Sequence, residues 1–465
     1  MKSIVALSLA AFAAAANAAS ISGVAASVGS DGTVTVTYSL DEDAVVTADF
    51  RENGTSIGGT NQWSLSGDVF KLVPAGPGVI TWNAKKDVPE RLFSALTVEL
   101  KAWAESDAPD YLIADLMAGS TCRLRYYPSV DFIPGGIVED EAYRMYYLPF
   151  RKIRAKGVTW TMGTETEKGR SADNEEAHEV TLGSNYYIGV FELTHAQCAA
   201  CGISVGGADS NNKAYNWRLI PQHRWTWNSF RGALPPAAPA ASSSFGKIKD
   251  RTGLLVDFPL ESQWEYAARG GYGEGTWGDG SDILSATSDR NLNNLASYKN
   301  HVNSITNTGS FSPNGYGLYD MHGNFNEYCQ DWFQPNIAGL NGALCVDAAD
   351  SSKRADGCAG TNRVVRGGYY GQAASCCRAS YRTGQGPGIT KTETSCRLMT
   401  YANLGEESEP ASAVLAEPFA LDTRSGEPAS AVTDAAVNLH SRRSVLSDAF
   451  AVDMLKVAGM LLLLR

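Results

Sequence analysis

The sequence predicts an α+β protein that is irregular and loop-rich and is preceded by a small all-β sandwich. Three observations support this fold class. Residues 20–105 contain short runs of alternating polar and apolar residues separated by turn signals. Residues 259–271 form a helical pattern that two glycines stop. Residues 313–333 combine many aromatic side chains with three glycines, which indicates a buried but irregular segment.

The N-terminus has the pattern of a secretory signal peptide over residues 1–18. Lys2 supplies a positive start, Ile4–Ala16 is apolar, and Ala16-Asn17-Ala18 is a small-x-small cleavage signal. The apolar run is too short to span a bilayer as a permanent anchor. We therefore expect cleavage after Ala18 and a secreted or periplasmic protein with no stable membrane span.

The composition and net charge restrict the kinds of partner that this protein can bind. Of the 465 residues 44 % are hydrophobic and 19 % charged, an ordinary balance for a soluble globular protein. The formal net charge of −11 argues against nucleic acid, which requires a basic face. Nine cysteines in an exported chain allow disulfides, but the odd number leaves at least one thiol unpaired or intermolecular.

Residues 19–105 have the signals of an antiparallel sandwich of immunoglobulin or fibronectin type. Thr33–Tyr38 and Val45–Phe50 alternate with period two, and further strands are expected at 79–82 and 96–103. Asn53-Gly54 is a strong hairpin signal. This region contains no cysteine and no cluster of titratable residues, so we expect a spacer or adhesion role.

The rest of the chain divides into a connector at 106–147, a second domain at 148–402 and a low-complexity tail at 403–465. In the second domain Thr194 and Gln197 form a capping box that begins a short helix. Cys198 and Cys201 then share one face of that helix, where core packing or a structural bond is favoured over redox chemistry. The tail is polar and rich in Ala and Ser, which predicts disorder.

The stretch 313–333 also carries oxygen ligands. Asp320, Asn324 and Glu327 place side-chain oxygens close together, and Gly323 permits a sharp turn that can direct backbone carbonyls to the same point. Such a set suits calcium, which binds six to eight oxygens. The alternative is that the carboxylates accept hydrogen bonds from nearby backbone N–H groups.

Six sequence blocks follow one another along the chain: Met162-Gly163-Thr164, Pro259–Gly271, Asn314–Trp332, Arg363–Gly368, Cys377–Arg382 and Ser395-Cys396-Arg397. In these blocks and their order the chain resembles the formylglycine-generating enzyme, or sulfatase-modifying factor, family over roughly 250 residues. The resemblance implies a variant C-type-lectin-like α+β fold with calcium in a structural role.

The resemblance also implies a reaction. Enzymes of this family oxidise a cysteine of a sulfatase to formylglycine with molecular oxygen and hold Cu(I) between two cysteines, because thiolates select Cu(I). By position the second cysteine matches Cys377, but the first matches Gln372 and a family serine matches Tyr369. Gln offers a hard amide oxygen, and the vicinal Cys376 is poorly placed to face Cys377 across one metal ion. We therefore do not expect a copper cofactor.

The resemblance places calcium at the Asp320 side chain, the Gly323 and Phe325 carbonyls and the Glu327 side chain. For a non-catalytic relative we expect a ligand surface at 369–390, whose residue types suit a protein or carbohydrate ligand through stacking and hydrogen bonds. Its predicted residues are Tyr369, Tyr370, Gln372, Arg378 and Arg382, unless the two arginines are structural.

Four functions stay open. The first is a secreted, non-catalytic ligand-binding module. The second is a formylglycine-generating oxidase that acts on a sulfatase-type peptide through Cys377 with altered metal chemistry. The others are a variable receptor of a diversity-generating retroelement and an oxidative activity like that of iron-dependent sulfoxide synthases, which require a His-rich motif that six scattered histidines do not provide.

Overall fold

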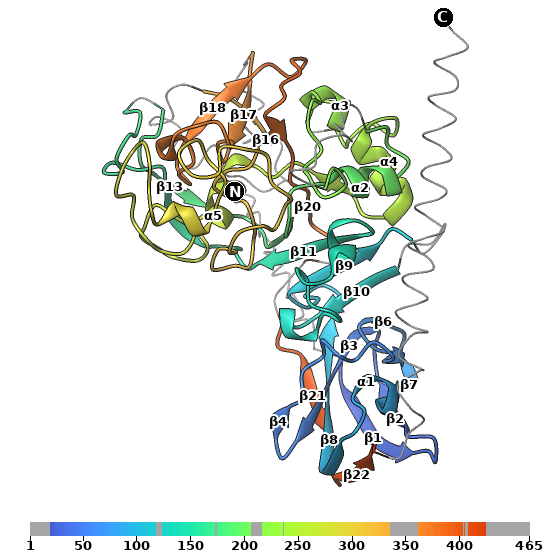
Figure 1. The fold of residues 1–465 in the computed structure, drawn as a ribbon. Helices are drawn as coiled ribbons and strands as arrows, with labels where there is room; N and C mark the ends of the chain where they lie inside the picture. Colours follow the sequence, from blue (N-terminus) through green and yellow to red (C-terminus); the bar gives the residue numbers. More distant parts are fainter. Residues whose placement is uncertain are drawn as a thin grey trace, which may run out of the picture. The chain divides into compact units, whose positions relative to one another are not determined.

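The computed structural model has a loop-rich α+β architecture, as predicted, and divides into two compact units that are described separately (Figure 1). One unit consists of residues 19–102, 131–135 and 411–424, and the other of residues 103–130 and 136–410. The predicted signal peptide, Cys122 and residues 425–465 of the predicted tail lie outside the described residues. These residues are 19–117, 123–172, 174–205, 216–235, 237–334, 361–402, 404 and 408–424.

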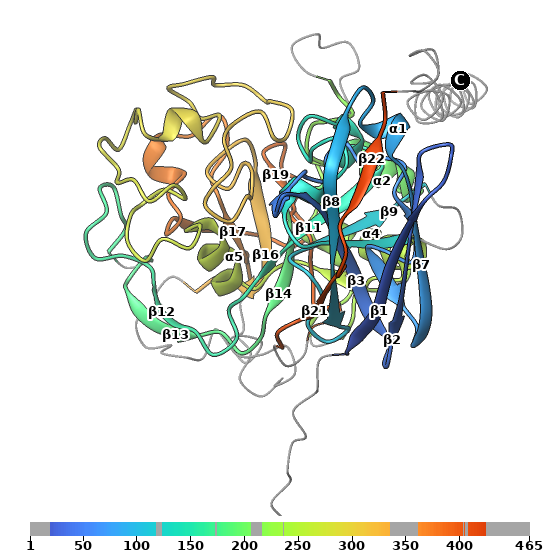
Figure 2. The same ribbon diagram turned by 90° about the horizontal axis from the view of Figure 1, so that it is seen from below.

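The first unit is a sandwich of two antiparallel sheets (Figure 2). One has the order β1-β2-β7-β5 and the other β21-β8-β3-β4, with β22 also on β8 and β6 on β3. The ring centroids of Phe50 in one sheet and Trp82 in the other are 4.6 Å apart, so side chains of the two sheets share a core. The bounds are β1 (Ile21–Val28), β2 (Thr33–Leu40), β3 (Ala44–Glu52), β4 (Thr55–Ser56), β5 (Ser66–Gly67), β6 (Lys71–Val73), β7 (Gly76–Asn83), α1 (Ala84–Asp87) and β8 (Leu92–Ala104).

The predicted strands of this unit lie within β2, β3, β7 and β8. In β2 the residues Val34, Val36 and Tyr38 are buried and their neighbours are more exposed, which is the predicted alternation. Asn53 and Gly54 join β3 to β4 with φ values of 50° and 79°, as a two-residue hairpin loop of type I′ requires.

The prediction of a disordered tail from residue 403 is wrong for residues 411–422. There β21 (Ala411–Val414) and β22 (Phe419–Asp422) pair antiparallel with β8. Leu421 is buried, and the Thr423 hydroxyl accepts a hydrogen bond from the Arg91 amide at 2.8 Å. The segment is ordered because β8 offers an open edge, whereas its own sequence has too few apolar residues to reveal a strand.

The connector predicted at residues 106–147 supplies strands to the second unit. A sheet of order β10-β9-β11-β14-β20-β15 begins with β9 and β10. The bounds are β9 (Tyr111–Asp115), β10 (Arg123–Tyr127), β11 (Tyr147–Ile153), β14 (Tyr186–Gly189), β15 (Val256–Asp257) and β20 (Met399–Thr400), with 3-10 turns η1 (Val130–Phe132) and η2 (Glu141–Arg144).

A second sheet of order β18-β17-β16-β19 and a β12–β13 hairpin complete the strands of this unit. The bounds are β12 (Thr159–Met162), β13 (His178–Thr181), β16 (Asn326–Trp332), β17 (Arg363–Arg366), β18 (Arg382–Gln385) and β19 (Thr394–Ser395). The helices are α2 (His195–Ala200), α3 (Trp227–Arg231), α4 (Ser244–Thr252) and α5 (Glu261–Ala268), with 3-10 turns η3 (Leu292–Asn294) and η6 (Ala374–Cys376).

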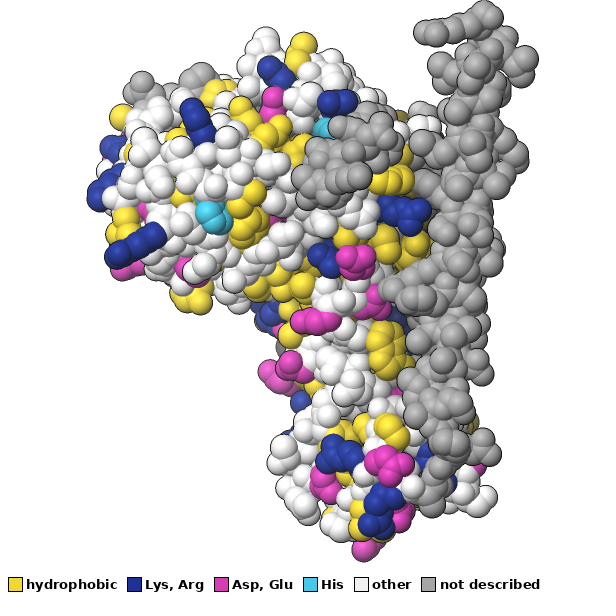
Figure 3. Space-filling view, viewed as in Figure 1, with side chains coloured by type: hydrophobic (Ala, Val, Ile, Leu, Met, Phe, Trp, Pro, Cys, Tyr) yellow, Lys and Arg dark blue, Asp and Glu magenta, His cyan; other side chains and the backbone are white. Residues whose placement is uncertain are grey.

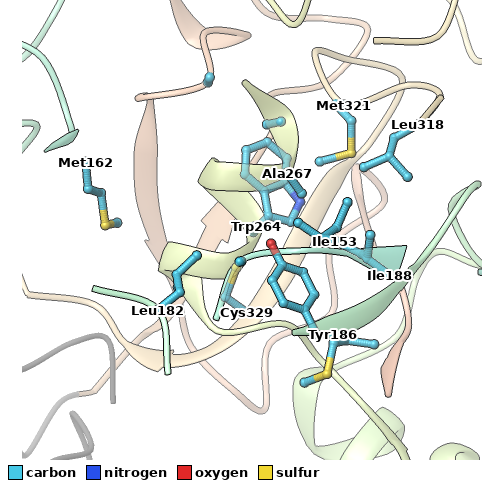
Figure 4. Packing of buried hydrophobic residues seen from close by; sticks show 14 of the residues in the cluster. Ile153, Met162, Leu182, Tyr186, Ile188, Trp264, Ala267, Leu318, Met321 and Cys329 are labelled. Atoms are coloured by element: carbon cyan, nitrogen blue, oxygen red, sulfur yellow. The ribbon is translucent and has the colours of Figure 1, made fainter. Parts of the chain in front are cut away.

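Helix α5 fixes the core of the second unit. It packs against β16 and β17, and its predicted buried stripe is confirmed, because Trp264, Ala267 and Ala268 are each 0 % exposed. Figure 4 shows Trp264 among Ile153 and Ile188, which come from β11 and β14 of the other sheet. The predicted capping box is also present, because Thr194 Oγ1 accepts from Gln197 N and the Gln197 side chain accepts from Thr194 N.

Within the described residues no helix is long and apolar enough to cross a membrane. On the face shown in Figure 3, lysine and arginine side chains are interspersed with aspartate and glutamate among the described residues. The described residues on that face form no extended basic area.

Candidate functional site

The stretch 313–333 forms irregular turns that lead into β16. Asp320 and Asn324 adopt the left-handed backbone conformation, with φ values of 60° and 65°. The Asp320 carboxylate accepts hydrogen bonds through Oδ2 from Thr308 Oγ1 at 3.0 Å and from Gly309 N at 2.7 Å. The carboxylate therefore holds a neighbouring loop in place.

Glu327 in β16 belongs to a fully buried ion pair. Arg397 donates to both carboxylate oxygens at 2.6–3.1 Å, and Trp264 Nε1 donates to Oε2 at 2.6 Å. Glu327 and Arg397 are each 0 % exposed. Arg397 also donates hydrogen bonds to the backbone carbonyls of Gly189, Val190 and Tyr319. This pair joins β16 to β14 and to the chain that precedes β20.

Hydrogen bonds already engage part of the oxygen set of the calcium site predicted at Asp320, Gly323, Phe325 and Glu327. Both Glu327 oxygens accept hydrogen bonds, and the Gly323 carbonyl accepts from Phe325 N at 2.9 Å. Calcium requires six to eight oxygens. Among the residues that the structure describes, no group of three or more His, Cys, Asp or Glu side chains is arranged to hold a metal ion. The alternative raised above holds for one bond, from Gly309 N to Asp320, whereas the donors to Glu327 are side chains. Asp320 Oδ1 is buried without a hydrogen-bond partner among the described residues, so calcium at this site stays a prediction.

Sequence reasoning missed Glu192, which lies buried beside this network. Its Oε2 accepts from Asn324 Nδ2 at 2.9 Å. Burial, and then repulsion from Asp320 and Glu327, raises the pKa of Glu192 well above its usual range. Burial also raises the pKa of Asp320. A buried carboxyl group can be neutralised by a proton, so this cluster does not require a cation. The signal in the sequence is a single Glu within the apolar run 190–193.

The second part of the site is the loop that follows β17. Gly367 and Gly368 have φ values of 90° and 71°. A Cβ atom on Gly368 would lie 2.4 Å from the Cys376 carbonyl oxygen and 2.9 Å from Cys377 Sγ. Only glycine fits there, and it lets residues 369–372 fold back against the two cysteines.

Gln372 is held by the loop itself. Its backbone N donates to the Tyr369 carbonyl at 2.9 Å, and its side-chain Oε1 accepts from Tyr369 N at 3.2 Å. The side chain also hydrogen bonds with Tyr381. The amide therefore has local partners at the position that the resemblance matches to the first copper cysteine.

Cys377 is 0 % exposed, and burial, followed by the neighbouring Cys376, raises the pKa of its thiol far above the usual range. The Cys377 carbonyl lies 2.9 Å from Nδ1 of His322, whose Nε2 accepts from Gly278 N at 2.8 Å. Burial lowers the pKa of His322 to about 4, so this ring is neutral and both of its nitrogens are engaged.

Cys376 is half-buried and shares a side-chain hydrogen bond with Tyr381. Burial raises the pKa of Tyr381 to about 12, so the phenol stays protonated. The possible metal ligands near residue 377 are thus the buried, protonated thiol of Cys377, the thiol of Cys376, which is hydrogen-bonded to Tyr381, and the side-chain amide of Gln372. Cu(I) selects thiolates, so these residues do not fit the copper ion of the related enzymes.

Arg378 and Arg382 are not part of a ligand surface, which corrects the prediction. Arg378 is 0 % exposed and pairs with Glu175 through bonds of 2.6 and 3.0 Å and with Glu167 at 3.1 Å. Arg382 is 3 % exposed and makes two bonds of 2.6 Å to the carboxylate of Glu261 at the start of α5. Both arginines are structural, because their donors are used inside the unit.

Tyr369 and Tyr370 are the predicted ligand residues that stay half-exposed beside Gln372. Their rings meet edge to face with centroids 5.5 Å apart, and Tyr370 meets Phe325 at 5.9 Å. Sequence reasoning missed the support behind them, since His223 packs on Phe325 at 5.1 Å and stacks on His195 at 5.1 Å. The rings of Phe325, His223 and His195 therefore form a buried row that packs behind Tyr370.

The comparisons with known proteins agree with the family blocks in the sequence. A family model described as "Sulfatase-modifying factor enzyme 1-like domain" matches residues 149–402. The formylglycine-generating enzyme of Thermomonospora curvata is 25 % identical over 311 residues, which cover 58 % of this chain and 98 % of that protein. The formylglycine-generating enzyme of Streptomyces coelicolor is 33 % identical over 132 residues, or 26 % of this chain and 37 % of that protein.

Among solved structures, Treponema denticola variable protein 1 is 20 % identical, covers 55 % of this chain and 96 % of that chain, and has a TM-score of 0.42. The matched family region begins within β11 and ends after β20, so it contains both sheets' strands around α5 and the loop after β17. It includes more than half of the 465 residues. This chain therefore belongs to the sulfatase-modifying factor family and has its loop-rich α+β, C-type-lectin-like fold.

Proposed function

We propose that this chain is an exported ligand-binding member of the family that does not oxidise cysteine to formylglycine. The observation that carries the proposal is the amide of Gln372, which is bonded to Tyr369 N where a soft sulfur ligand is needed. Cys377 offers one buried thiol, and its raised pKa keeps it protonated near neutral pH.

The proposed ligand surface consists of Tyr369, Tyr370 and Gln372. The two half-exposed rings supply apolar faces with polar hydroxyls, which suits stacking on a sugar ring or a peptide side chain. Tyr369 contacts Tyr370, and Tyr370 contacts Phe325, which His223 supports from behind. These ring contacts limit rotation of the two tyrosines, so little side-chain entropy is lost on binding. We expect a protein or carbohydrate ligand.

The competing function is a formylglycine-generating oxidase acting on a sulfatase-type peptide through Cys377. Its support is the likeness to the Thermomonospora curvata enzyme over 98 % of that protein's length. Because such an enzyme needs a second sulfur or another metal ligand, this function also depends on altered metal chemistry.

One experiment separates the two functions. The purified protein is incubated with a sulfatase-motif peptide, Cu(I) and oxygen, and the peptide is weighed by mass spectrometry. We expect the peptide to keep its thiol, and conversion to the aldehyde would overturn the proposal. Gln372→Cys restores the second sulfur and should raise Cu(I) affinity, with Gln372→Ser as the matched control that adds a small polar side chain without a soft ligand.

A further inference from the structure

A lysine and an aspartate meet in the interior of the unit that contains β9 and β11. Lys152 lies in β11, and Asp107 lies between β8 and β9. The Lys152 side chain is 0 % exposed and that of Asp107 is 2 % exposed. Lys152 Nζ donates to Asp107 Oδ1 and, at 2.9 Å, to the Ala108 carbonyl. Full burial of both partners is rare for these residue types.

The surroundings fix the carboxyl group and exclude water. Ser408 N donates to Asp107 Oδ2 at 2.9 Å. Tyr187 is 0 % exposed, and its hydroxyl donates to the Pro109 carbonyl and lies 3.3 Å from the Ala108 carbonyl oxygen that also holds Lys152 Nζ. The amine and both carboxylate oxygens are thus each held by a named partner.

We propose that Lys152 and Asp107 form a modification site, at which an intramolecular isopeptide bond joins Lys152 Nζ to the side-chain carbonyl carbon of Asp107. The neutral amine attacks the carbon of the protonated carboxyl group, and an N–C bond forms. One C–O bond breaks, an amine proton moves to the departing hydroxyl, and one water molecule is released. The condensation involves no oxidant, reductant or other reactant.

Three features of the site favour this reaction. The amine and the carboxyl group are held in contact, which removes the entropy cost of bringing them together. Burial lowers the pKa of Lys152, which favours the neutral amine when a proton passes to the carboxylate. The Ser408 N–H bonds the oxygen on which negative charge develops when the amine adds.

One contact opposes the reaction, because a guanidinium favours the ionised carboxylate. Arg154 Nη1 lies 3.4 Å from Asp107 Oδ1, but the Arg154 side chain is 41 % exposed. Solvent therefore screens this charge far more than it screens the buried amine. The exclusion of water favours condensation further, since hydrolysis of the product would need water at the same place.

The test is peptide mapping of the purified full-length protein after reduction, denaturation and trypsin digestion. We expect residues 102–123 joined to residues 152–154, lighter than the two peptides together by one water, with no cleavage after Lys152. Linear peptides carrying free Asp107 and Lys152 as the main species in the wild-type protein would overturn the proposal, and this measurement needs no variant to fold.

Variants then assign the bond. Lys152→Arg and Asp107→Ala should give only linear peptides. Asp107→Asn should give the same linked mass as the wild type, because an amide that loses ammonia leaves the same product as an acid that loses water. Asp110→Asn is the matched control, since Asp110 pairs with Arg151 at 2.7 Å nearby and should leave the linked peptide intact.

Discussion

The structural assignment of Arg378 predicts a large loss of stability when its charge is removed. Arg378→Met keeps most of the side-chain volume but leaves Glu175 and Glu167 next to each other, with exposed fractions of 1 % and 9 %. Breaking a buried ion pair by removing one partner costs about 3–5 kcal/mol. The matched control is Arg170→Met, whose partner Glu165 is 53 % exposed, so a change within about 1 kcal/mol is expected.

The corresponding shift in the melting midpoint follows from the size of the unit. For a cooperative unit of about 300 residues, 1 kcal/mol corresponds to about 1.6 °C, so Arg378→Met should melt about 5–8 °C below the wild type. Differential scanning calorimetry on wild type and both variants measures this shift. A melting point for Arg378→Met equal to that of the control would refute the structural assignment and return Arg378 to the ligand surface.

The pH dependence of the deficit gives a second readout. Burial already raises the pKa of Glu167 in the wild type, and loss of Arg378 should raise it further. A group with a raised pKa in the folded state stabilises the protein below its unfolded pKa, and this stability is lost as pH rises through the folded pKa. The loss in free energy of unfolding caused by Arg378→Met should therefore be largest at about pH 8 and smaller at about pH 5. A deficit that grows on acidification would contradict this cause.

The remaining predictions concern the two loops and the sandwich. A chelator tests the predicted calcium site, and we expect an unchanged melting midpoint because Arg397 and Trp264 already donate to the carboxylate oxygens of Glu327. A lower midpoint, together with bound calcium in elemental analysis, would support the calcium site instead. Gly368→Ala should destabilise the protein by more than the roughly 1–3 kcal/mol that a strained backbone costs, because the added Cβ would meet the Cys376 carbonyl. Gly157→Ala is the control, since Gly157 has a similar φ of 74° but open space around it. Equal free energies of unfolding in urea for the two variants would argue against the tight turn. Deletion from Ala411 onward should expose the β8 edge and promote self-association on size-exclusion chromatography, and a monomer with unchanged melting would show that β21 and β22 are dispensable.

The fold class was predictable because its signals are local. The alternation of polar and apolar residues in Thr33–Tyr38 arises within one strand that has one face towards the core. The buried stripe of Trp264, Ala267 and Ala268 likewise arises within one helix. The tail and the connector were not predictable, because β21 and β22 depend on the edge of β8, and β9 depends on β11, partners that lie far away in sequence. Short strands that receive their partner from another segment carry little signal of their own.

The site was predictable only in part, for a similar reason. Tyr369, Tyr370 and Gln372 lie together because they are close in sequence. The role of Arg378 depends on Glu175, which is 203 residues away, and nothing near Arg378 in the sequence reveals that partner. Aromatic and arginine residues in one loop suit both a ligand surface and a buried network, and only the position of the distant carboxylates decides between them.

The buried network also explains why the fold of the loop after β17 does not depend on the side chain of residue 372. The loop after β17 is held by Gly368, by Arg378 with its two glutamates, and by the bond between His322 and the Cys377 carbonyl. None of these contacts involves the side chain of residue 372, which bonds only within its own loop and to Tyr381 among the interactions described. A change of that side chain from thiol to amide therefore alters the chemistry of the loop without removing the contacts that position Tyr369 and Tyr370. Selection for a ligand could then act on the two tyrosines independently of the metal, which is why the Gln372→Cys variant should fold like the wild type even as its affinity for Cu(I) rises.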